Sequence, residues 1–267
     1  MDENLSDLIS DTHYENFTDS YILVGSDFEF SLACVGAILE NEIPVSAIGG
    51  LTAEQIVAAT SLKVRNPKLV ITNTEKPWEE SRFLEATCGT GKLGISCGLE
   101  TIVPAEFLAN RFCINTHPSA LPYNKGSHQS FWAIMDETKG GGTLHVMTKK
   151  IDDGPILYQD VFDIPEHMIS RDLQTKQLST CIELLRKNIK NIFLGNFSSK
   201  PQIGGRTHYK RDIIEASTLL IDESIEVSEL FKLVRATCNR GNGFWIQTQN
   251  VRYRIIVSNV ESVNLDL

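Results

Sequence analysis

The sequence predicts an α/β fold with a mostly parallel, Rossmann-like sheet, followed by a small α+β subdomain that ends in a hairpin. Short apolar runs alternate with polar, helix-compatible segments in the first part of the chain, as is typical of a parallel sheet. A long amphipathic stretch follows, and the last part changes to a short helix and two alternating strands. We therefore expect an acidic extension over residues 1–20, a main domain over 21–200 and a subdomain over 201–267.

The expected strands of the main domain are short apolar runs that end at turn residues. Tyr21–Gly25 (YILVG) predicts a buried first strand, and the segment from about Glu29 to Glu40 predicts the helix after it. Gly49 and Gly50 are expected to stop the second strand. The further strands of this part are expected at 43–48, 68–72, 92–96 and 112–116.

A hairpin and a long helix are expected next. Asp152-Asp153-Gly154-Pro155 is a turn signal between two alternating strands at 143–149 and 156–162. Apolar residues then form one helical stripe, which predicts a helix closed by Gly195 and Asn196. The stripe consists of Leu178, Cys181, Ile182, Leu185, Ile189, Ile192 and Phe193. The subdomain elements are a helix at 227–237 and strands at 244–248 and 252–257, joined across Gln249 and Asn250.

The charge of the chain argues against a nucleic-acid partner. The 267 residues include 25 Lys and Arg against 34 Asp and Glu, a formal net charge of −9. Residues 1–20 hold six acids and no Lys or Arg, residues 21–169 hold 11 basic and 18 acidic residues, and residues 170–267 hold 14 and 10. A protein that wraps nucleic acid must neutralise phosphates with Lys and Arg. The mildly basic last part fits one diphosphate rather than a polyanion.

Neither a membrane segment nor a disulfide framework is visible. The longest apolar run, Leu32–Leu39, is far shorter than the roughly 18 residues of a membrane span, and the acidic N-terminus lacks the features of a signal peptide. The six cysteines are scattered, without a Cys-x-x-Cys pair or a Cys/His cluster. We therefore expect a cytoplasmic protein with reduced thiols, no membrane partner and no structural zinc.

One stretch combines residue types that serve in acyl transfer. Asn115 and His117 lie two residues apart at the end of an expected strand, so their side chains project to one face. Pro118 and Pro122 follow and break regular structure. The side chains of Asn115 and His117 are therefore expected at the carboxyl edge of the sheet, where ligands bind in open α/β folds. Asp152 opens the turn 35 residues (152 − 117) later. Histidine can move a proton near neutral pH, an amide can donate to an oxyanion, and a carboxylate can orient the histidine.

The string Asn-x-His-Pro-Ser-x-Leu-Pro, followed by Ile-Asp-x-Gly-Pro-Ile, resembles the folate-dependent formyltransferase family. The resemblance extends from Tyr21 to the end of the long helix near Asn196. It implies that Asn115 holds the formyl oxygen and the tetrahedral intermediate, that His117 is the general base and acid, and that Asp152 positions His117. The formyl donor it implies is N10-formyltetrahydrofolate, and it implies no metal.

In this family the pterin lies between two loops and is bound largely by backbone groups. The loops correspond here to residues 97–104 and 148–152, and the cofactor-binding candidates are Cys97, Ile102, Thr148 and Ile151. His145 shares a strand face with Thr143 and Met147. It either lines the folate site or is simply packed, and we favour packing.

The acceptor candidates follow the motif. The loop from Leu121 to Trp132 opens the next helix near Ser127, and its lysine, glycine and helix start could hold a phosphate or diphosphate. An aromatic side chain could cover a base or sugar. The substrate-binding candidates are Ser119, Tyr123, Lys125, Gly126, His128 and Tyr209. A helix surface is the equal alternative for His128, and a solvated basic face is the equal alternative for Tyr209.

The tail bears on the acceptor. The segments Gly204–Ile213 and Leu220–Ala236 are similar to the tail of nucleotide-sugar N-formyltransferases. In that group the usual acceptor is a dTDP-linked 3-amino- or 4-amino-dideoxyglucose, and the product enters surface polysaccharide. The resemblance therefore implies dTDP-4-amino-4,6-dideoxyglucose as the acceptor. The small C-terminal hairpin separately suggests a homodimer.

Other members of the family fit less well. A methionyl-tRNA enzyme carries a larger, basic C-terminal domain, and a glycinamide ribonucleotide enzyme ends soon after the long helix. The phosphate loop of the ribonucleotide enzyme would meet Asp27 here, which repels phosphate and leaves Gly25 as a turn residue. The alternatives that remain are a formyltetrahydrofolate deformylase, although that enzyme has a domain before the first strand, and a non-catalytic ligand-binding protein on the same fold.

Overall fold

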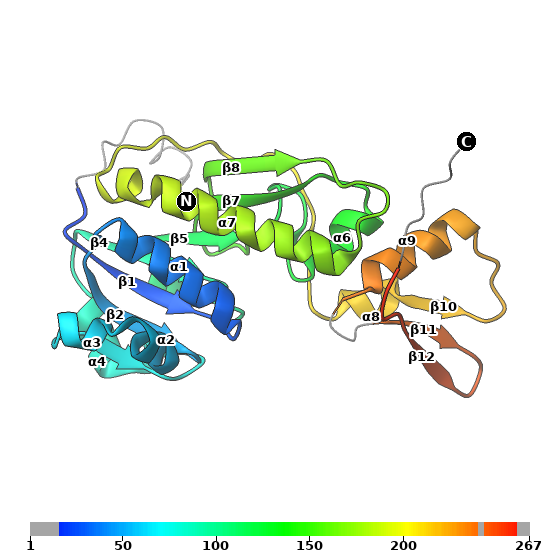
Figure 1. Ribbon diagram of the computed structural model, residues 1–267, viewed down its shortest axis with the longest axis horizontal. Helices are drawn as coiled ribbons and strands as arrows, with labels where there is room; N and C mark the ends of the chain where they lie inside the picture. Colours follow the sequence, from blue (N-terminus) through cyan, green and yellow to red (C-terminus); the bar gives the residue numbers. More distant parts are fainter. Residues whose placement is uncertain (1–15, 240–242, 261–267) are drawn as a thin grey trace, which may run out of the picture. The chain divides into compact units, whose positions relative to one another are not determined.

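The computed structural model describes residues 16–239 and 243–260, and the chain divides into two compact units (Figure 1). Unit 1 consists of the described residues up to His117 together with Gly142–Asp160 and Thr180–Ile203. Unit 2 consists of Pro118–Gly141, Val161–Ser179 and the described residues from Gly204 onward. The expected border at residue 200 lies close to the last change of unit, but two segments of the expected main domain group with unit 2.

A seven-stranded sheet organises unit 1, in the order β3-β2-β1-β4-β5-β7-β8. The first five strands in this order pair in parallel, and β7 pairs antiparallel with β5. The strands are β1 (Asp19–Val24), β2 (Val45–Gly50), β3 (Val70–Thr72), β4 (Lys92–Cys97), β5 (Phe112–His117), β7 (Gly140–Val146) and β8 (Ile156–Phe162). The expected mostly parallel α/β sheet is confirmed.

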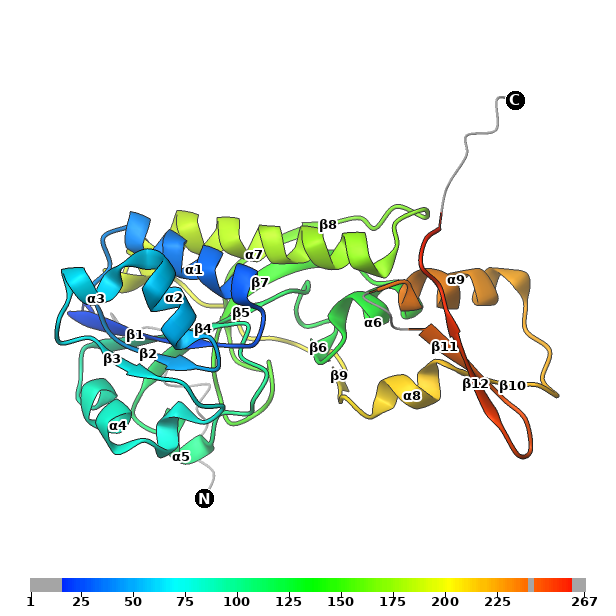
Figure 2. The same ribbon diagram turned by 60° about the horizontal axis from the view of Figure 1, so that its bottom comes forward.

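Helices cover both faces of the parallel strands. Figure 2 shows α1 and α2 on one face and α4 and α5 on the other. The helices are α1 (Phe28–Glu40), α2 (Ala53–Thr60), α3 (Leu62–Arg65), the 3₁₀ turn η2 (Pro77–Glu79), α4 (Ser81–Thr87), α5 (Ala105–Leu108) and α7 (Ser170–Phe193). This cover explains why Tyr21, Ile22 and Leu23 are all fully buried, whichever face they point to. Among the described residues, no helix is both long and apolar enough to cross a bilayer.

Two strand limits differ from the expectation because glycines lie inside strands. The second strand was expected to stop at Gly49, but β2 includes both glycines, and a Cβ on Gly50 would lie 2.0 Å from the carbonyl oxygen of Val24. β7 begins at Gly140 rather than at residue 143. A Cβ on Gly142 would lie 3.0 Å from the backbone nitrogen of Cys181, so the glycine permits α7 to approach the strand.

The first strand also begins earlier than expected. β1 starts at Asp19, and the backbone nitrogen of Phe17 donates to the carbonyl oxygen of Phe193 at 2.9 Å. Phe17 is buried against Phe112 and Phe193. Residues 17–20 of the expected acidic extension therefore belong to the folded part of unit 1, whereas residues 1–15 lie outside the described residues.

Unit 2 contains two small sheets, in the orders β10-β11-β12 and β6-β9. β11 and β12 form the expected antiparallel hairpin, and β10 adds a parallel strand that was not expected. The elements are β6 (Lys125–Gly126), α6 (Gln129–Met135), β9 (Thr207–His208), α8 (Asp212–Ala216), β10 (Thr218–Leu220), α9 (Val227–Thr237), β11 (Gly243–Gln247) and β12 (Arg252–Ile256).

The core of unit 2 explains why a segment from the middle of the chain groups with the tail. Phe131 and Trp132 of α6 lie in one apolar cluster with Leu233 and Ala236 of α9 and with Phe244 of β11. All of these side chains are buried. The tail alone is too small to bury much apolar surface, so it shares a core with α6.

Candidate active site

The catalytic candidates meet where β5 ends. Asn115 and His117 lie on β5, and β7 runs antiparallel beside it with His145 directly opposite Asn115. Asp152 follows in the loop after β7 and has a positive φ of 49°. Because this loop returns over the ends of both strands, side chains from three segments of unit 1 come together.

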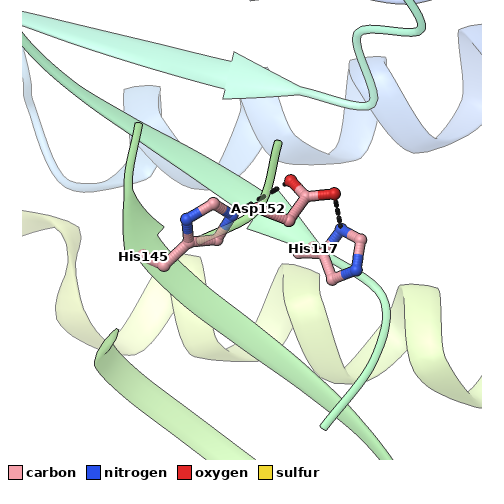
Figure 3. A group of neighbouring side chains, drawn as sticks. All are labelled: His117, His145 and Asp152. Carbon is pink, nitrogen blue, oxygen red and sulfur yellow. Dashed lines mark ion pairs between the residues drawn. The ribbon is translucent and has the colours of Figure 1, made fainter. Parts of the chain in front are cut away.

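The carboxylate of Asp152 lies between two imidazoles, as Figure 3 shows. Nδ1 of His117 is 3.4 Å from Oδ2 of Asp152, and Nε2 of His145 is 3.4 Å from Oδ1. Nδ2 of Asn115 donates to Oδ1 of Asp152 at 3.3 Å and lies 3.3 Å from Nε2 of His145. His117 and His145 are each 2% exposed, so the polar groups of this cluster satisfy one another largely away from water.

The loop that carries Asp152 is held by its backbone. Nε2 of Gln202 donates to the carbonyl oxygens of Asp152 and Gly154, at 2.8 and 2.7 Å. A Cβ on Gly154 would lie 1.8 Å from the carbonyl oxygen of Val146, so glycine is required where the loop passes β7. Asp153 is partly exposed and forms an ion pair with Lys150 at 3.7 Å. The loop therefore presents the first of its two carboxylates to the cluster.

This arrangement can support proton transfer at a carbonyl. A carboxylate that accepts from Nδ1–H of His117 fixes the ring and leaves Nε2 as the basic nitrogen. The amide of Asn115 supplies an N–H donor beside it. Base and oxyanion donor on one strand face are the pair that acyl transfer needs, and the structure brings together the three residues that the motif implies.

The same cluster resembles a set of metal ligands. One ligand atom from each of His117, His145 and Asp152 lies within 4.8 Å of the others. A zinc ion with bonds of about 2.1 Å holds its ligands no more than about 4.2 Å apart, so binding would require these side chains to draw together. The spacing therefore fits a hydrogen-bonded cluster better than a zinc centre.

The folate candidates also lie in unit 1. Ile102 is 67% exposed on the loop after β4, and Ile151 and Thr148 are partly buried. Cys97 is fully buried, and its carbonyl oxygen accepts from the hydroxyl of Ser31 at 3.2 Å. Of these candidates, Cys97 can therefore shape a folate loop only through its backbone, whereas Ile102 offers an apolar side chain.

The start of α1 explains the acidic residue after the first strand. The carboxylate of Asp27 accepts from the backbone nitrogen of Phe30 at 3.1 Å, so it caps the helix. A Cβ on Gly25 would lie 1.7 Å from the carbonyl oxygen of Gly98, so the glycine permits two loops to approach closely. Gly25 is required by this contact, and the expectation of a simple turn residue misses it.

Among the acceptor candidates of unit 2, three support the backbone. Lys125 is 3% exposed, and its ammonium donates to the carbonyl oxygen of Gly204 at 2.9 Å. Gly126 has a φ of 87°, and a Cβ there would lie 2.1 Å from the carbonyl oxygen of His208. The hydroxyl of Ser119 donates to the carbonyl oxygen of Tyr123 at 2.9 Å. Lys125 and Gly126 fasten the loop to β9 through the pairing of β6 with β9, whereas the Ser119 hydrogen bond lies within the loop.

The other three candidates present their side chains differently. Tyr123 and Tyr209 are about half exposed, at 50% and 48%. His128 has a φ of 60° and precedes α6, and burial lowers its pKa, with a further decrease from the nearby Lys210. Because α6 has only seven residues, its N-terminus adds little to anion binding. The two tyrosines are therefore the candidates with surface to offer to a ligand.

His145 is the site residue that sequence reasoning underestimated. It is buried, as packing implies, but it also takes part in the polar cluster with Asn115 and Asp152. The signal was available in the alternation of the strand around it, but only the register with β5 places it opposite Asn115.

Comparison with known proteins finds a family that matches this part of the chain. Residues 93–187, which include β5, β7 and the Asp152 loop, match the formyl transferase family. The chain contains a formyl transferase domain. This domain carries all four residues of the polar cluster.

Relatives of the formyl transferase domain include enzymes with different acceptors. The chain is 31% identical over 124 residues to a methionyl-tRNA formyltransferase of Clostridium acetobutylicum (46% of this chain, 40% of the relative). It is 27% identical over 134 residues to a dTDP-4-amino-4,6-dideoxyglucose formyltransferase of Mycobacterium bovis (50% and 57%). The chain thus spans about half the length of the curated relatives that it matches.

Solved structures resemble nearly the whole chain. A 4-N formyltransferase from Francisella tularensis superposes with a TM-score of 0.73 at 21% identity, over 91% of this chain and 98% of that one. An N-formyltransferase from Helicobacter canadensis, solved with folinic acid and dTDP-3-aminofucose, superposes with a TM-score of 0.64 at 21% identity, over 83% and 81%. The fold, including the part outside the formyl transferase domain, is therefore that of sugar N-formyltransferases.

Proposed function

We propose that the protein is an N-formyltransferase that moves the formyl group of N10-formyltetrahydrofolate to the amine of a dTDP-linked amino-dideoxy sugar, with dTDP-4-amino-4,6-dideoxyglucose as the acceptor. The observation that carries the proposal is the cluster of Asn115, His117 and Asp152 at the end of β5, inside the formyl transferase domain. A base, an oxyanion donor and an orienting carboxylate are the groups that this reaction needs.

The reaction follows from the positions of these groups. The neutral amine of the acceptor attacks the formyl carbon, and the N–H of Asn115 stabilises the oxyanion that forms. His117 takes the proton that the amine loses, and Asp152 stabilises the resulting imidazolium. The bond between the formyl carbon and N10 then breaks, and His117 returns the proton to N10. The products are the formamido sugar and tetrahydrofolate.

The solved relatives support the choice of both substrates. The Helicobacter canadensis enzyme was solved with a folate and a dTDP-linked amino sugar, and the Mycobacterium bovis relative is named for the 4-amino acceptor. For folate we propose the loops after β4 and β7, with Ile102 and Ile151 against the pterin. For the acceptor we propose Tyr123 and Tyr209, because their rings are exposed.

We also propose a homodimer in a reducing compartment. The six cysteines are unpaired, which fits the cytoplasm. β12 is an edge strand whose apolar residues, Tyr253, Ile255 and Ile256, are exposed. An exposed apolar edge favours association, and we propose a second copy of this chain as the partner. Light scattering of the purified protein and of Ile255→Glu measures the oligomeric state, and a monomeric wild-type protein contradicts the dimer.

A panel assay tests the proposed function. The protein is incubated with N10-formyltetrahydrofolate and dTDP-, UDP- and GDP-linked 3-amino and 4-amino sugars, and the formylated sugar is measured by mass spectrometry. We expect formylation of the dTDP-linked 4-amino sugar, and a loss of at least about 10²-fold in kcat in His117→Ala and Asn115→Ala at unchanged thermal stability. Formate release without any acceptor identifies a deformylase, and near-normal turnover of either variant refutes the mechanism.

A further inference from the structure

We infer that His145 is a positioning residue that sets the donor orientation of the Asn115 amide. The inference rests on the proposed function for its kinetic consequence, but its structural content is independent of the substrate. His145 faces Asn115 across the β5–β7 pairing and is 2% exposed. It belongs to none of the three motif positions and does more than fill space, since both of its ring nitrogens have polar neighbours.

The tautomer of His145 follows from its backbone neighbour. Nδ1 lies 2.9 Å from the carbonyl oxygen of Val146. A carbonyl oxygen only accepts, so Nδ1 carries the hydrogen. In the neutral ring, Nε2 is then the nitrogen without a hydrogen, and it can only accept. Two groups lie near Nε2. Oδ1 of Asp152, at 3.4 Å, can only accept, so the donor to Nε2 is Nδ2 of Asn115 at 3.3 Å.

This requirement fixes which end of the Asn115 amide points into the cluster. Both His145 Nε2 and Asp152 Oδ1 are acceptors at 3.3 Å, so the nitrogen faces them and the oxygen points away. If the amide turned over, its oxygen would face two acceptors in a buried place, which is unfavourable. An aliphatic side chain at position 145 would remove one of the two groups that oppose this rotation.

The distances also allow one hydrogen of the Asn115 amide to serve both acceptors. The two acceptors are 3.4 Å apart and each is 3.3 Å from Nδ2, so they diverge by only about 60° at the nitrogen. A hydrogen directed between the two acceptors points within about 30° of each, so one N–H bond of Asn115 can serve both His145 and Asp152. In this arrangement the other N–H bond diverges from the first by about 120° and points out of the cluster, as an oxyanion donor must.

Three substitutions separate positioning from packing. In His145→Gln, the side-chain amide reaches the place of Nε2, and its oxygen can accept from Asn115. In His145→Asn, the amide reaches only the place of Nδ1, so the contact with Val146 remains and the acceptor for Asn115 is lost. His145→Leu keeps an apolar volume and neither contact. The first two variants are matched in chemistry and differ in reach.

The kinetic experiment compares kcat and KM of these variants with the folate donor and the acceptor found in the panel. We expect His145→Asn and His145→Leu to lose about 10²-fold in kcat with KM within about two-fold of the wild type. We expect His145→Gln to stay within about five-fold of wild-type kcat. If His145 only fills space, the three variants rank differently, and the loss in kcat of each follows the decrease in its melting temperature. Wild-type kcat in a folded His145→Asn variant overturns the inference.

A second measurement needs no substrate. Long-range proton–nitrogen NMR spectra of protein labelled with ¹⁵N-histidine report the tautomer of each ring, and His145→Gln assigns the signal among the six histidines. We expect the Nδ1–H tautomer for His145, with an Nε2 shift that changes in Asn115→Ala. An Nε2–H tautomer overturns the inference whatever the activity. If the wild type formylates no acceptor, the proposed function fails, and this measurement still decides the role of His145.

Discussion

The buried ammonium of Lys125 donates a hydrogen bond to the carbonyl oxygen of Gly204 at 2.9 Å, which fastens the loop before α6 to the segment that leads into β9. The position of this lysine beside the catalytic motif suggested a phosphate ligand, but its ammonium is occupied by the protein. Two kinds of measurement distinguish a structural role from a binding role.

We expect Lys125→Met to lower the free energy of unfolding by about 1–3 kcal/mol, because the carbonyl oxygen of Gly204 loses a buried charged donor. Thermal or urea unfolding measures the loss, and Lys210→Met is the control. We expect KM for the nucleotide sugar to change little. An unchanged stability together with a strongly raised KM shows instead that Lys125 binds the diphosphate.

Two neighbouring glycines predict different costs for an added methyl group. Gly204 and Gly205 have φ values of 75° and 85°, but a Cβ on Gly205 would lie 1.9 Å from the carbonyl oxygen of Pro122, whereas a Cβ on Gly204 has nothing within 4 Å. We expect Gly204→Ala to destabilise by about 1–2 kcal/mol, from the backbone conformation alone. Gly205→Ala should lower the free energy of unfolding by clearly more, as measured by urea unfolding. Equal losses contradict the close contact with Pro122.

Substitution of the two neighbouring aspartates in the loop after β7 is expected to affect kcat differently. Asp152 faces His117 and His145, whereas Asp153 is partly exposed beside Lys150. We expect Asp152→Asn to lower kcat by about 10²- to 10⁴-fold, because a neutral amide lacks the negative charge with which the carboxylate stabilises the imidazolium of His117. Asp153→Asn should leave kcat unchanged. Steady-state kinetics of both variants measure this difference, and a similar effect of the two changes argues against the assigned roles.

The buried imidazole of His208 is expected to make the stability of the protein depend on pH. It is 1% exposed and stacks on Trp132 with ring centroids 3.9 Å apart. Burial lowers its pKa below the ordinary 6.5, and of the charged groups that face it, Asp136 and Asp212 raise the pKa and Arg206 lowers it. Between the lowered pKa and 6.5 the unfolded chain binds more protons than the folded one, so stability falls as pH decreases through this window.

We therefore expect the melting temperature to fall between about pH 7.5 and about pH 5.5, and His208→Gln to weaken that dependence. The comparison uses the slope with pH, because loss of the stack on Trp132 lowers the melting temperature of the variant at every pH. His128, whose pKa is also lowered by burial, contributes in the same direction. An unchanged slope in His208→Gln shows that other groups control the pH dependence.

The strands near the site show which structural features the sequence patterns predicted and which they did not. The apolar runs predicted β1, β4 and β5 closely, because strands buried on both faces are short and continuously apolar. The same reasoning misplaced the limits of β2 and β7, where glycines inside a strand look like turns. Those glycines are required by contacts with Val24 and Cys181, which lie far away in the sequence.

The sequence by itself determined the α/β class and the strand face shared by Asn115 and His117, because strand periodicity is a local property. The resemblance of its motifs to the formyltransferase family indicated Asp152 as their partner. Only the tertiary structure decided that His145 lies opposite Asn115, that Lys125 is buried on Gly204, and that α6 shares a core with α9. The physical reason is that strand register and shared apolar burial depend on segments distant in the chain, and no local pattern records which segments meet.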